Sequence, residues 1–511
     1  MKIKWIFGIA ISGIVFVAMV FGSLFYFNQE DTSLVDTVES ISPVGVQNNS
    51  NFNTQMDASI LSFDLGEMTL KDESNLIQIP LKGSLVVPEV EGEYPIVFIF
   101  SDLNAKEGVS RAYDEILAAI GSTNCLAIHL DLSELSSIEG YDEEMLKSVF
   151  DEYRQRLSQS LLGENDEFGV ELTNKGSLAK VVMIGHGKST TNVYKIALDQ
   201  EYKQQLSLAG LLLIDPVDTN YKELSYPDVP TAIMLSEYNE DEHLVGKALY
   251  EDYRQEKARK SMTSLVYVKA GKFDDFNVAD SELESVLNFE HNVEFVSQYI
   301  VDFLQSVFDS SPIGSGFTVL EMMPKTLYGA EVRTSLTVPN TMMLINAQIE
   351  SNPTVNTLGG KIIANDINIE RTTDGTTSFL MKWDDTNASL SIEIPKGSRD
   401  LSHYDAISLY LSNQLSNEVM SGEVIQNQLA TQSFEIELID EQNQTSNASI
   451  NSIEELVLMG TNEQVLYNER LALNQFKEVD LTKIKQINLL FNQSSQGCIR
   501  LADLSFVKEP Q

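Results

Sequence analysis

The chain has 511 residues, of which 43% are hydrophobic and 22% are charged, and its formal net charge at pH 7 is −40. This length exceeds what one ordinary core accommodates, so we expect two or more folded domains. The strong negative charge argues against partners such as nucleic acid or anionic lipid headgroups, which would repel it.

The first segment predicts a membrane anchor. Residues 5–27 contain no charged side chain, and a helix of that length spans the hydrocarbon core of a bilayer. Lys2 and Lys4 precede the run, and basic residues favour the cytoplasmic side. A cleaved signal peptide is the alternative, but its apolar region is normally shorter, about 7–15 residues. We therefore predict an uncleaved single-pass anchor over residues 1–28, with the body of the protein outside the cell membrane.

The next two segments differ in amino-acid composition and in hydrophobic pattern. Residues 29–59 are rich in Asn, Ser, Thr, Asp and Gln and predict a flexible stalk. From residue 60 to residue 310, apolar runs alternate with helical patterns, of which 145–157 and 293–308 are examples. The runs typical of strands covered on both faces are 76–79, 96–100, 125–130, 181–184, 211–214, 231–235 and 264–268. The alternation predicts an α/β domain with a doubly wound, mostly parallel sheet.

The chain changes character again after residue 310. Residues 310–316 read Ser-Ser-Pro-Ile-Gly-Ser-Gly, which is a linker composition. Residues 317–511 then carry short alternating strands separated by turn residues, which predicts an antiparallel β-sandwich domain. We expect residues 317–362 to supply extra strands that bridge the two domains.

Cysteine and histidine usage gives no sign of a disulfide framework or a metal centre. Cys125 lies in a buried-strand pattern and Cys498 near the last strand of the other domain, so we expect two separate core thiols. The five histidines are scattered along the chain, and no EF-hand-type loop is present. We predict neither a metal site nor a cofactor.

The most informative stretch is Val-Val-Met-Ile-Gly-His-Gly-Lys-Ser at residues 181–189. An apolar strand runs directly into a glycine turn and then into a helical pattern. This is the layout of a nucleophile elbow, whose sequence pattern is Gly-x-Ser-x-Gly. The central position, where the serine would stand, is Gly187. Glycine has no side chain, so no acyl-enzyme can form at this position.

Residues 65–308 resemble the α/β-hydrolases, most closely the bacterial secreted esterases related to dienelactone hydrolase and chlorophyllase. The stretches that carry the likeness are PLKGSLVVP at 80–88, YPIVF at 94–98, GHGKS at 185–189, LLIDPV at 212–217 and VPTAIML at 229–235. The resemblance implies the α/β-hydrolase fold. For an intact member it implies hydrolysis of carboxylic esters by a catalytic triad.

The resemblance also indicates where the triad would stand, and two of its positions are altered. The nucleophile position is Gly187. The base would be a histidine on the loop after the last strand, residues 270–277, but this loop contains no histidine. Lys272 or Phe273 occupies the base position, depending on the alignment. The loss of the nucleophile alone removes covalent catalysis.

The acid and the oxyanion region complete the comparison with that family. Asp215, Glu240 and Asp241 are the alternatives for the acid, in a chain where carboxylates are abundant. The segment after Phe100, which helps to form the oxyanion hole, contains Asp102. A carboxylate beside a developing oxyanion raises the barrier. A water-based mechanism that uses one of these carboxylates as base is an alternative that the sequence leaves open.

Other candidate groups near the motif have simpler interpretations. Ser189 lies two residues beyond Gly187, and we interpret it as a polar residue in the first turn of a helix. His186 is expected to line the turn, His129 to lie in a strand core, and His291 to lie at the start of the last helix of the first domain.

The second domain resembles the galactose-binding-like jelly rolls of the carbohydrate-binding-module type. Its matching stretches are residues 399–409, 434–440, 476–485 and 497–506. A sugar site on such a fold would need exposed aromatic side chains. Trp383 and Tyr404 are candidates, but we expect both to be buried by packing.

These observations favour one function and leave two alternatives. The favoured hypothesis is an extracytoplasmic pseudo-hydrolase that binds or scaffolds an envelope protein or a glycan without catalysis. One alternative is an active esterase-type hydrolase with a relocated site. The other is a glycan-binding surface protein in which the first domain is an inert spacer.

Overall fold

The computed structural model describes residues 59–72, 75–103, 110–135, 138, 143–217, 225–238, 243–273, 276, 287–309, 311–350, 353–414, 431–458 and 463–510. The predicted membrane anchor, and all of the predicted stalk except Ser59, lie outside these residues. Within the described residues, no helix combines the length and the apolar character needed to cross a membrane. All of them belong to one compact unit.

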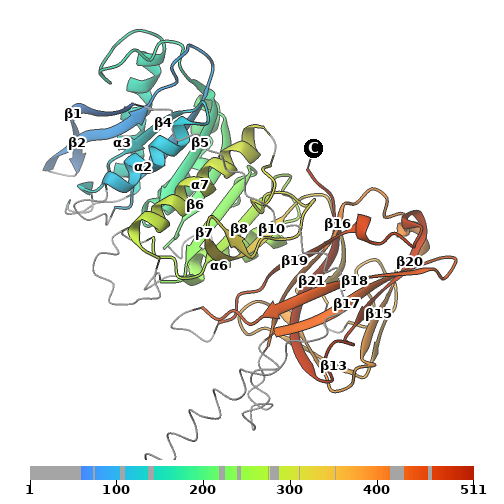
Figure 1. Cartoon of the computed structure of the whole chain (residues 1–511). Coiled ribbons are helices and arrows are strands. Elements are labelled where there is room, and N and C mark those ends of the chain that lie inside the picture. The colour runs from blue at the N-terminus through green and yellow to red at the C-terminus, as the bar shows by residue number, and fades with distance from the viewer. Residues whose placement is uncertain are drawn as a thin grey trace, which may run out of the picture. The chain divides into compact units, whose positions relative to one another are not determined.

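A ten-stranded sheet organises the first half of this unit (Figure 1), in the order β1-β2-β4-β3-β5-β6-β7-β8-β10-β9. Its strands are β1 (Ile60–Asp72), β2 (Asn75–Val86), β3 (Pro95–Phe100), β4 (Leu126–Leu130), β5 (Ser177–His186), β6 (Leu208–Ile214), β7 (Thr231–Ser236), β8 (Thr263–Val268), β9 (Thr326–Leu327) and β10 (Ala330–Thr337). Strands β3 to β8 pair in parallel, and the outer strands pair antiparallel. Each predicted apolar run coincides with one of the strands β2 to β8, so the mostly parallel sheet is confirmed.

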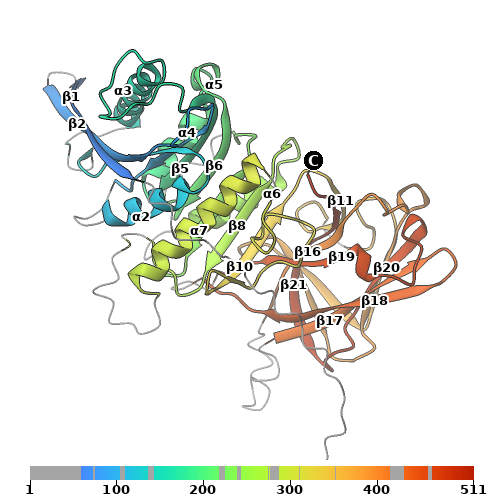
Figure 2. The same cartoon turned by 45° about the horizontal axis from the view of Figure 1, so that its top comes forward.

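Helices cover both faces of this sheet, which makes it doubly wound. They are α2 (Ser110–Gly121), α3 (Glu143–Leu161), α4 (Ser189–Leu198), α5 (Tyr202–Gln205), α6 (His243–Gln255) and α7 (Phe289–Phe308). Helices α2 and α7 lie side by side on one face (Figure 2), and α3, α4 and α6 pack on the other. Strand β5 serves both cores, because Val181 and Met183 point into one and Val182 and Ile184 into the other.

Two antiparallel sheets form the second half. One has the order β13-β14-β21-β16-β19, with β11 also paired to β21, and the other has the order β12-β15-β20-β17-β18. The strands are β11 (Thr341–Asn346), β12 (Ile362–Asn365), β13 (Ile367–Thr372), β14 (Ser378–Trp383), β15 (Ser389–Glu393), β16 (Ala406–Asn413), β17 (Thr431–Asp440), β18 (Thr445–Glu454), β19 (Tyr467–Ala472), β20 (Ile484–Leu490) and β21 (Gly497–Val507).

The two antiparallel sheets share one apolar core, as expected for a β-sandwich. Alternate residues of β17 point inward, and Phe434, Ile436 and Leu438 are fully buried. They join a cluster with Phe379 of β14 and Leu501 of β21, which belong to the six-stranded sheet. Short 3-10 turns at Lys396–Ser398, Leu473–Gln475 and Leu481–Lys483 connect some of the strands.

The expected bridge between the two halves is present. Strand β10 follows the predicted linker, yet it pairs with β8 and extends the first sheet. Strand β19 of the sandwich bonds to β10, because Leu336 N donates to Asn468 Oδ1 at 2.8 Å and Arg470 Nη2 donates to Leu336 O at 3.2 Å. Complete burial lowers the pKa of Arg470 to about 10. The α/β sheet therefore contains strands from the region that the sequence assigns to the sandwich, residues 317–511.

A cluster of buried charges joins α6 to the six-stranded sheet of the sandwich. Glu251 accepts hydrogen bonds from Tyr410 Oη at 2.8 Å and from Arg254 Nη2 at 2.7 Å. Arg254 also pairs with Asp503 of β21 and lies over the Tyr410 ring. Burial acts to raise the pKa of Glu251, but the nearby Arg254 guanidinium outweighs it, so the net shift is downward. We call Glu251, Arg254, Tyr410 and Asp503 the α6 charge cluster.

Candidate functional site

The elbow has the backbone geometry that its sequence pattern predicts. Strand β5 ends at His186, α4 begins at Ser189, and Gly187 between them has φ +55°. This left-handed conformation favours glycine, which has no Cβ to clash with the backbone. Gly187 N donates to Ile214 O at 2.9 Å, and Thr190 Oγ1 donates to Gly187 O at 2.6 Å. The sharp strand-to-helix turn is therefore intact.

The carboxylate of Asp102 fills the space beside Gly187. An ideal Cβ placed on Gly187 would lie 2.5 Å from Asp102 Cγ and 2.6 and 2.7 Å from its two carboxylate oxygens. Asp102 Oδ1 also accepts a hydrogen bond from Lys188 N at 3.1 Å. In α/β-hydrolases, the N–H of the residue after the nucleophile is one of the oxyanion-hole donors. The Asp102 carboxylate thus fills the space that a side chain at residue 187 would need, and it bonds to the N–H of the following residue.

Buried groups hold Asp102 in this position. Its backbone N donates to Tyr113 Oη at 3.0 Å, and that oxygen lies 2.7 Å from His186 Nδ1. Burial raises the pKa of Tyr113, so its phenol stays protonated. The tautomer of His186 decides which of the two groups donates in the bond between Tyr113 Oη and His186 Nδ1. In either case His186 bonds to a tyrosine hydroxyl.

The loop that would carry the base presents aromatic rings instead of an imidazole. Phe273 is fully buried, and its ring centroid lies 6.1 Å from that of Phe295 in α7. Lys272 is half-buried, and its backbone N donates to Asn292 Oδ1 at 3.1 Å. The ring of Phe276 lies 4.9 Å from the His186 ring. Sequence reasoning missed Phe276, although it lies in the 270–277 segment.

Of the three acid candidates, the structure describes only Asp215. It follows β6 with φ +44° and is buried. Its Oδ1 accepts from Ser236 N at 2.8 Å, and its Oδ2 accepts from Ser236 Oγ at 2.5 Å. These bonds tie Asp215 to the end of β7. Glu240 and Asp241 lie outside the described residues.

The remaining polar groups around the elbow have structural partners. Ser189 is fully buried, and its Oγ lies 3.0 Å from Phe100 O, 2.9 Å from His186 O and 3.0 Å from His186 N. His129 stacks on Tyr113 with 4.2 Å between ring centroids. Burial lowers the pKa of His129 to about 4, so it is neutral at pH 7. His291 is exposed, and its backbone N donates to Asn288 Oδ1, the N-cap of α7.

The cysteines and the metal-binding residue types supply no alternative reactive group in the described residues. Cys125 and Cys498 are both free and buried, as two separate core thiols. Burial raises the pKa of both thiols, that of Cys498 to about 12, which disfavours the nucleophilic thiolate. In the part of the chain that the structure describes, His, Cys, Asp and Glu form no group of three able to hold a metal ion.

The aromatic candidates of the sandwich lie in packed positions. Trp383 is buried, and its ring centroid lies 4.4 Å from that of Phe491. Tyr404 is half-buried against Phe506. Neither presents the exposed ring that a sugar-stacking site requires.

Comparison with known proteins supports the fold of the first domain. The family model described as Chlorophyllase matches residues 58–236, and no curated protein matches the chain. A dienelactone hydrolase-like promiscuous phosphotriesterase from metagenomic libraries is 12% identical over 48% of this chain and 98% of that chain, with a TM-score of 0.32. A family 11 carbohydrate-binding module from Clostridium thermocellum is 10% identical over 33% of this chain and 96% of that chain, with a TM-score of 0.23. Given the Chlorophyllase match, the strand order and the intact elbow, the region from β1 to α7 is an α/β-hydrolase-like domain.

Proposed function

We propose that this α/β-hydrolase-like domain is catalytically inactive and that the protein works by binding, as a membrane-anchored scaffold at the cell envelope. The observation that carries the proposal is the Asp102 carboxylate, which lies where a nucleophile side chain would stand at Gly187 and accepts from Lys188 N. A chain selected for ester hydrolysis would keep both positions free for serine and substrate.

The chemistry of the elbow also argues against hydrolysis by direct attack of a water molecule. A hydrolytic water still generates an oxyanion, and that charge needs preorganised donors. The Lys188 N–H already bonds to Asp102 Oδ1, so a second negative oxygen at this point would meet a carboxylate a few ångströms away. Like charges at such a distance in a buried site repel strongly. The same carboxylate therefore opposes covalent and water-based routes alike.

A relocated serine finds no support at Ser189, the nearest hydroxyl along the chain. Its Oγ lies within 3.0 Å of the backbone oxygens of Phe100 and His186 and of the backbone nitrogen of His186. A hydroxyl committed in this way has no base to accept its proton and no open space in which to attack. We therefore assign Ser189 to fixing the turn.

The proposed location rests on the N-terminal sequence. Residues 5–27 lack charge and follow Lys2 and Lys4, which favours an anchor with the body outside the cytoplasm. The partner is then an envelope protein or a glycan. In membrane fractionation, we expect the full chain to sediment with membranes after a high-salt wash and a variant lacking residues 5–27 to be released. Release of the full chain by the wash would count against the anchor.

Fluorophosphonate labelling of the full-length protein in detergent tests the loss of catalysis. We expect no labelled serine in the natural chain. Labelling of one serine that disappears in the matching Ser→Ala variant would overturn the proposal. The matched positive variant combines Asp102→Gly, Gly187→Ser and Lys272→His, with Asp102→Gly alone as its control. Labelling of the triple variant only would support the proposal that the natural residues at these three positions prevent nucleophilic catalysis at the elbow.

A further inference from the structure

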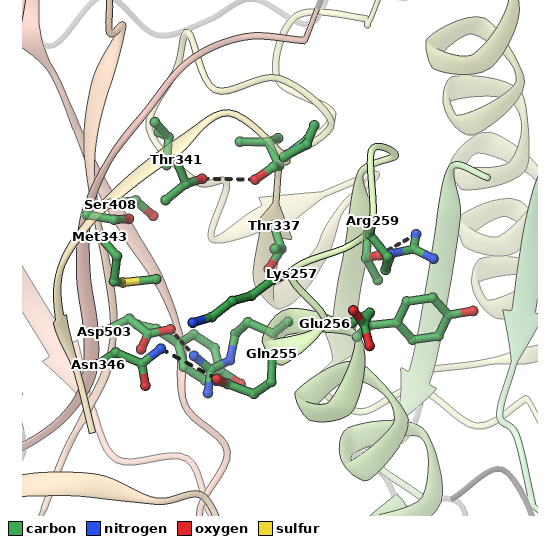
Figure 3. Close-up of a pocket in the computed structure, with 18 of the residues that line it drawn as sticks. Gln255, Glu256, Lys257, Arg259, Thr337, Thr341, Met343, Asn346, Ser408 and Asp503 are labelled. Atoms are coloured by element: carbon green, nitrogen blue, oxygen red, sulfur yellow. Dashed lines mark hydrogen bonds and ion pairs between the residues drawn. The ribbon is translucent and has the colours of Figure 1, made fainter. Parts of the chain in front are cut away.

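A second concave site lies away from the elbow, where the chain after α6 faces the six-stranded sheet of the sandwich (Figure 3). The cavity has a volume of about 330 Å³ and is lined by residues that follow α6, by the β10–β11 connection and by β16 and β21. None of the elbow residues lines it. Pockets of this size hold small organic ligands.

The first sign of a ligand is an unsatisfied carboxylate oxygen. Asp503 lines the cavity and is only 6% exposed. Its Oδ2 pairs with Arg254, whereas its Oδ1 is buried and has no hydrogen-bond partner. Leaving a buried acceptor unpaired is costly. A donor group on a bound molecule would remove this cost.

Two threonines on the same cavity add further acceptors. Thr341 Oγ1 donates to Val338 O at 2.9 Å, and Thr357 Oγ1 donates to Met343 O. Each hydroxyl has thus committed its proton to the backbone and offers lone pairs to the cavity. Together with Asp503 Oδ1, the acceptors come from three separate segments of the chain. A ligand that satisfies them needs donors at several points of its surface.

Among the described residues, the cations that line this cavity differ in whether they have an ion-pair partner. Arg254 belongs to the α6 charge cluster, and Arg259 donates to the carbonyl oxygens of Pro227 and Val229. Lys257 is exposed, and among the described residues it has no ion-pair partner. In Figure 3 its side chain extends across the space toward the wall that carries Met343 and Asp503. In a chain of net charge −40, a free ammonium at a pocket indicates an anionic ligand.

We propose that this cavity binds a small polyhydroxylated carboxylate, of the chemical class of the uronic acids. Its hydroxyl groups would donate to Asp503 Oδ1 and to the threonine oxygens, and its carboxylate would pair with Lys257. Met343 and Val338 also line the cavity and would contact the C–H face of the sugar ring. An α-amino acid fits less well, because its donors are concentrated in one ammonium group.

Saturation-transfer NMR and isothermal titration on the full-length protein in detergent test the proposal. The probes are glucuronate, glucose and glutamate, each up to about 10 mM, a range that detects weak binding. We expect glucuronate to bind, with glucose and glutamate at least about tenfold weaker, since a charge-assisted contact contributes that much. Added salt should weaken glucuronate binding, because Lys257 is exposed.

Matched variants locate the binding in this cavity. Lys257→Gln should weaken glucuronate binding about tenfold. Lys260→Gln, which alters an exposed lysine outside the cavity lining, should leave binding unchanged. Thr357→Trp places a bulky side chain at an exposed position on the cavity and should abolish binding. Circular dichroism checks that each variant is folded.

Several results would overturn the proposal. These are no glucuronate binding at any concentration tested, equal binding of glucose, tighter binding of glutamate, or glucuronate binding that persists in folded Lys257→Gln and Thr357→Trp variants. The variants leave Asp102 and Gly187 untouched, so a failure here is distinguishable from a failure of the proposed loss of catalysis.

Discussion

The elbow at Gly187 and the cavity beside Asp503 differ in whether a buried carboxylate has its hydrogen-bond partners within the chain. At the elbow, the Asp102 carboxylate fills the space beside Gly187 and accepts a hydrogen bond from Lys188 N. At the cavity, a carboxylate oxygen is buried without a partner and open space remains beside it. The contrast teaches that the site inherited from a fold and the site with capacity for a ligand need not coincide.

The largest effect that would sharpen this contrast comes from Arg254. Arg254→Met leaves Glu251 and Asp503 buried without their cation. We expect the free energy of unfolding to fall by about 3–5 kcal/mol, as for other buried pairs that lose one partner. Urea denaturation measures it. The exposed pair Arg111–Glu115 provides the control, since Arg111→Met should change stability by less than about 1 kcal/mol. Equal losses would mean that the α6 charge cluster contributes no more than a surface pair.

The next effect tests how tightly the elbow is filled. Gly187→Ala introduces a Cβ at φ +55° and against the Asp102 carboxylate, and we expect a loss of about 2–4 kcal/mol from strain and overpacking. Gly169 has φ +71° with nothing within 4 Å of its Cβ position. Gly169→Ala should therefore cost only the backbone part, about 1–2 kcal/mol.

A double-mutant cycle isolates the contact with Asp102. Asp102→Gly should recover the steric part of the Gly187→Ala loss, giving a coupling of about 1–2 kcal/mol in urea denaturation. Strictly additive effects would show that Asp102 does not occupy the nucleophile's space in solution.

A smaller effect comes from acid titration behind the elbow. Burial lowers the pKa of His129 to about 4 from its ordinary 6.5, and this effect outweighs the opposing effect of the Asp131 charge. The unfolded chain therefore binds a proton that the folded chain refuses, so stability is lost as pH falls through this window. We expect His129 to account for a loss of about 2 kcal/mol between about pH 6 and about pH 4.5.

Replacing His129 identifies this contribution. His129→Phe retains a ring to stack on Tyr113 but cannot titrate, so its unfolding free energy should fall less steeply over the same pH range. Urea denaturation at matched pH values compares the two proteins. Identical slopes would show that another group causes the acid sensitivity.

Sequence patterns predicted the centre of the first sheet better than its margin. The buried strands are continuous apolar runs, such as Val181 to Ile184, which remain recognisable without tertiary information. Strand β1 was missed because it is an edge strand with alternating polar residues. Asp64 and Glu67 flank a register shift at Gly66, where φ is +81°. A bulge of this kind breaks the period on which sequence reasoning depends.

The sequence names the candidate residues of the elbow, but it does not show how they are arranged. Gly187 and Asp102 stand out in the sequence as misfits for a hydrolase. Their direct contact depends on how the end of β3 meets the elbow, 85 residues later in the chain. Phe276 could have been identified from the sequence, because it lies with Phe273 on the loop that was expected to carry the histidine base. Arg254 and Asp503 are separated by 249 positions in the chain. No sequence pattern indicated that they pair, because charged residues on a helix ordinarily face solvent.

The pairing of β10 with β8 has a consequence for how this chain can be divided. A chain that ended at residues 310–316 would lack β10 and β9 and would leave the edge of β8 exposed. Exposed sheet edges of this kind recruit other chains and promote aggregation. The two halves therefore cannot be separated at this linker, and an exchange of the sandwich alone would have to leave β9 and β10 with the first half.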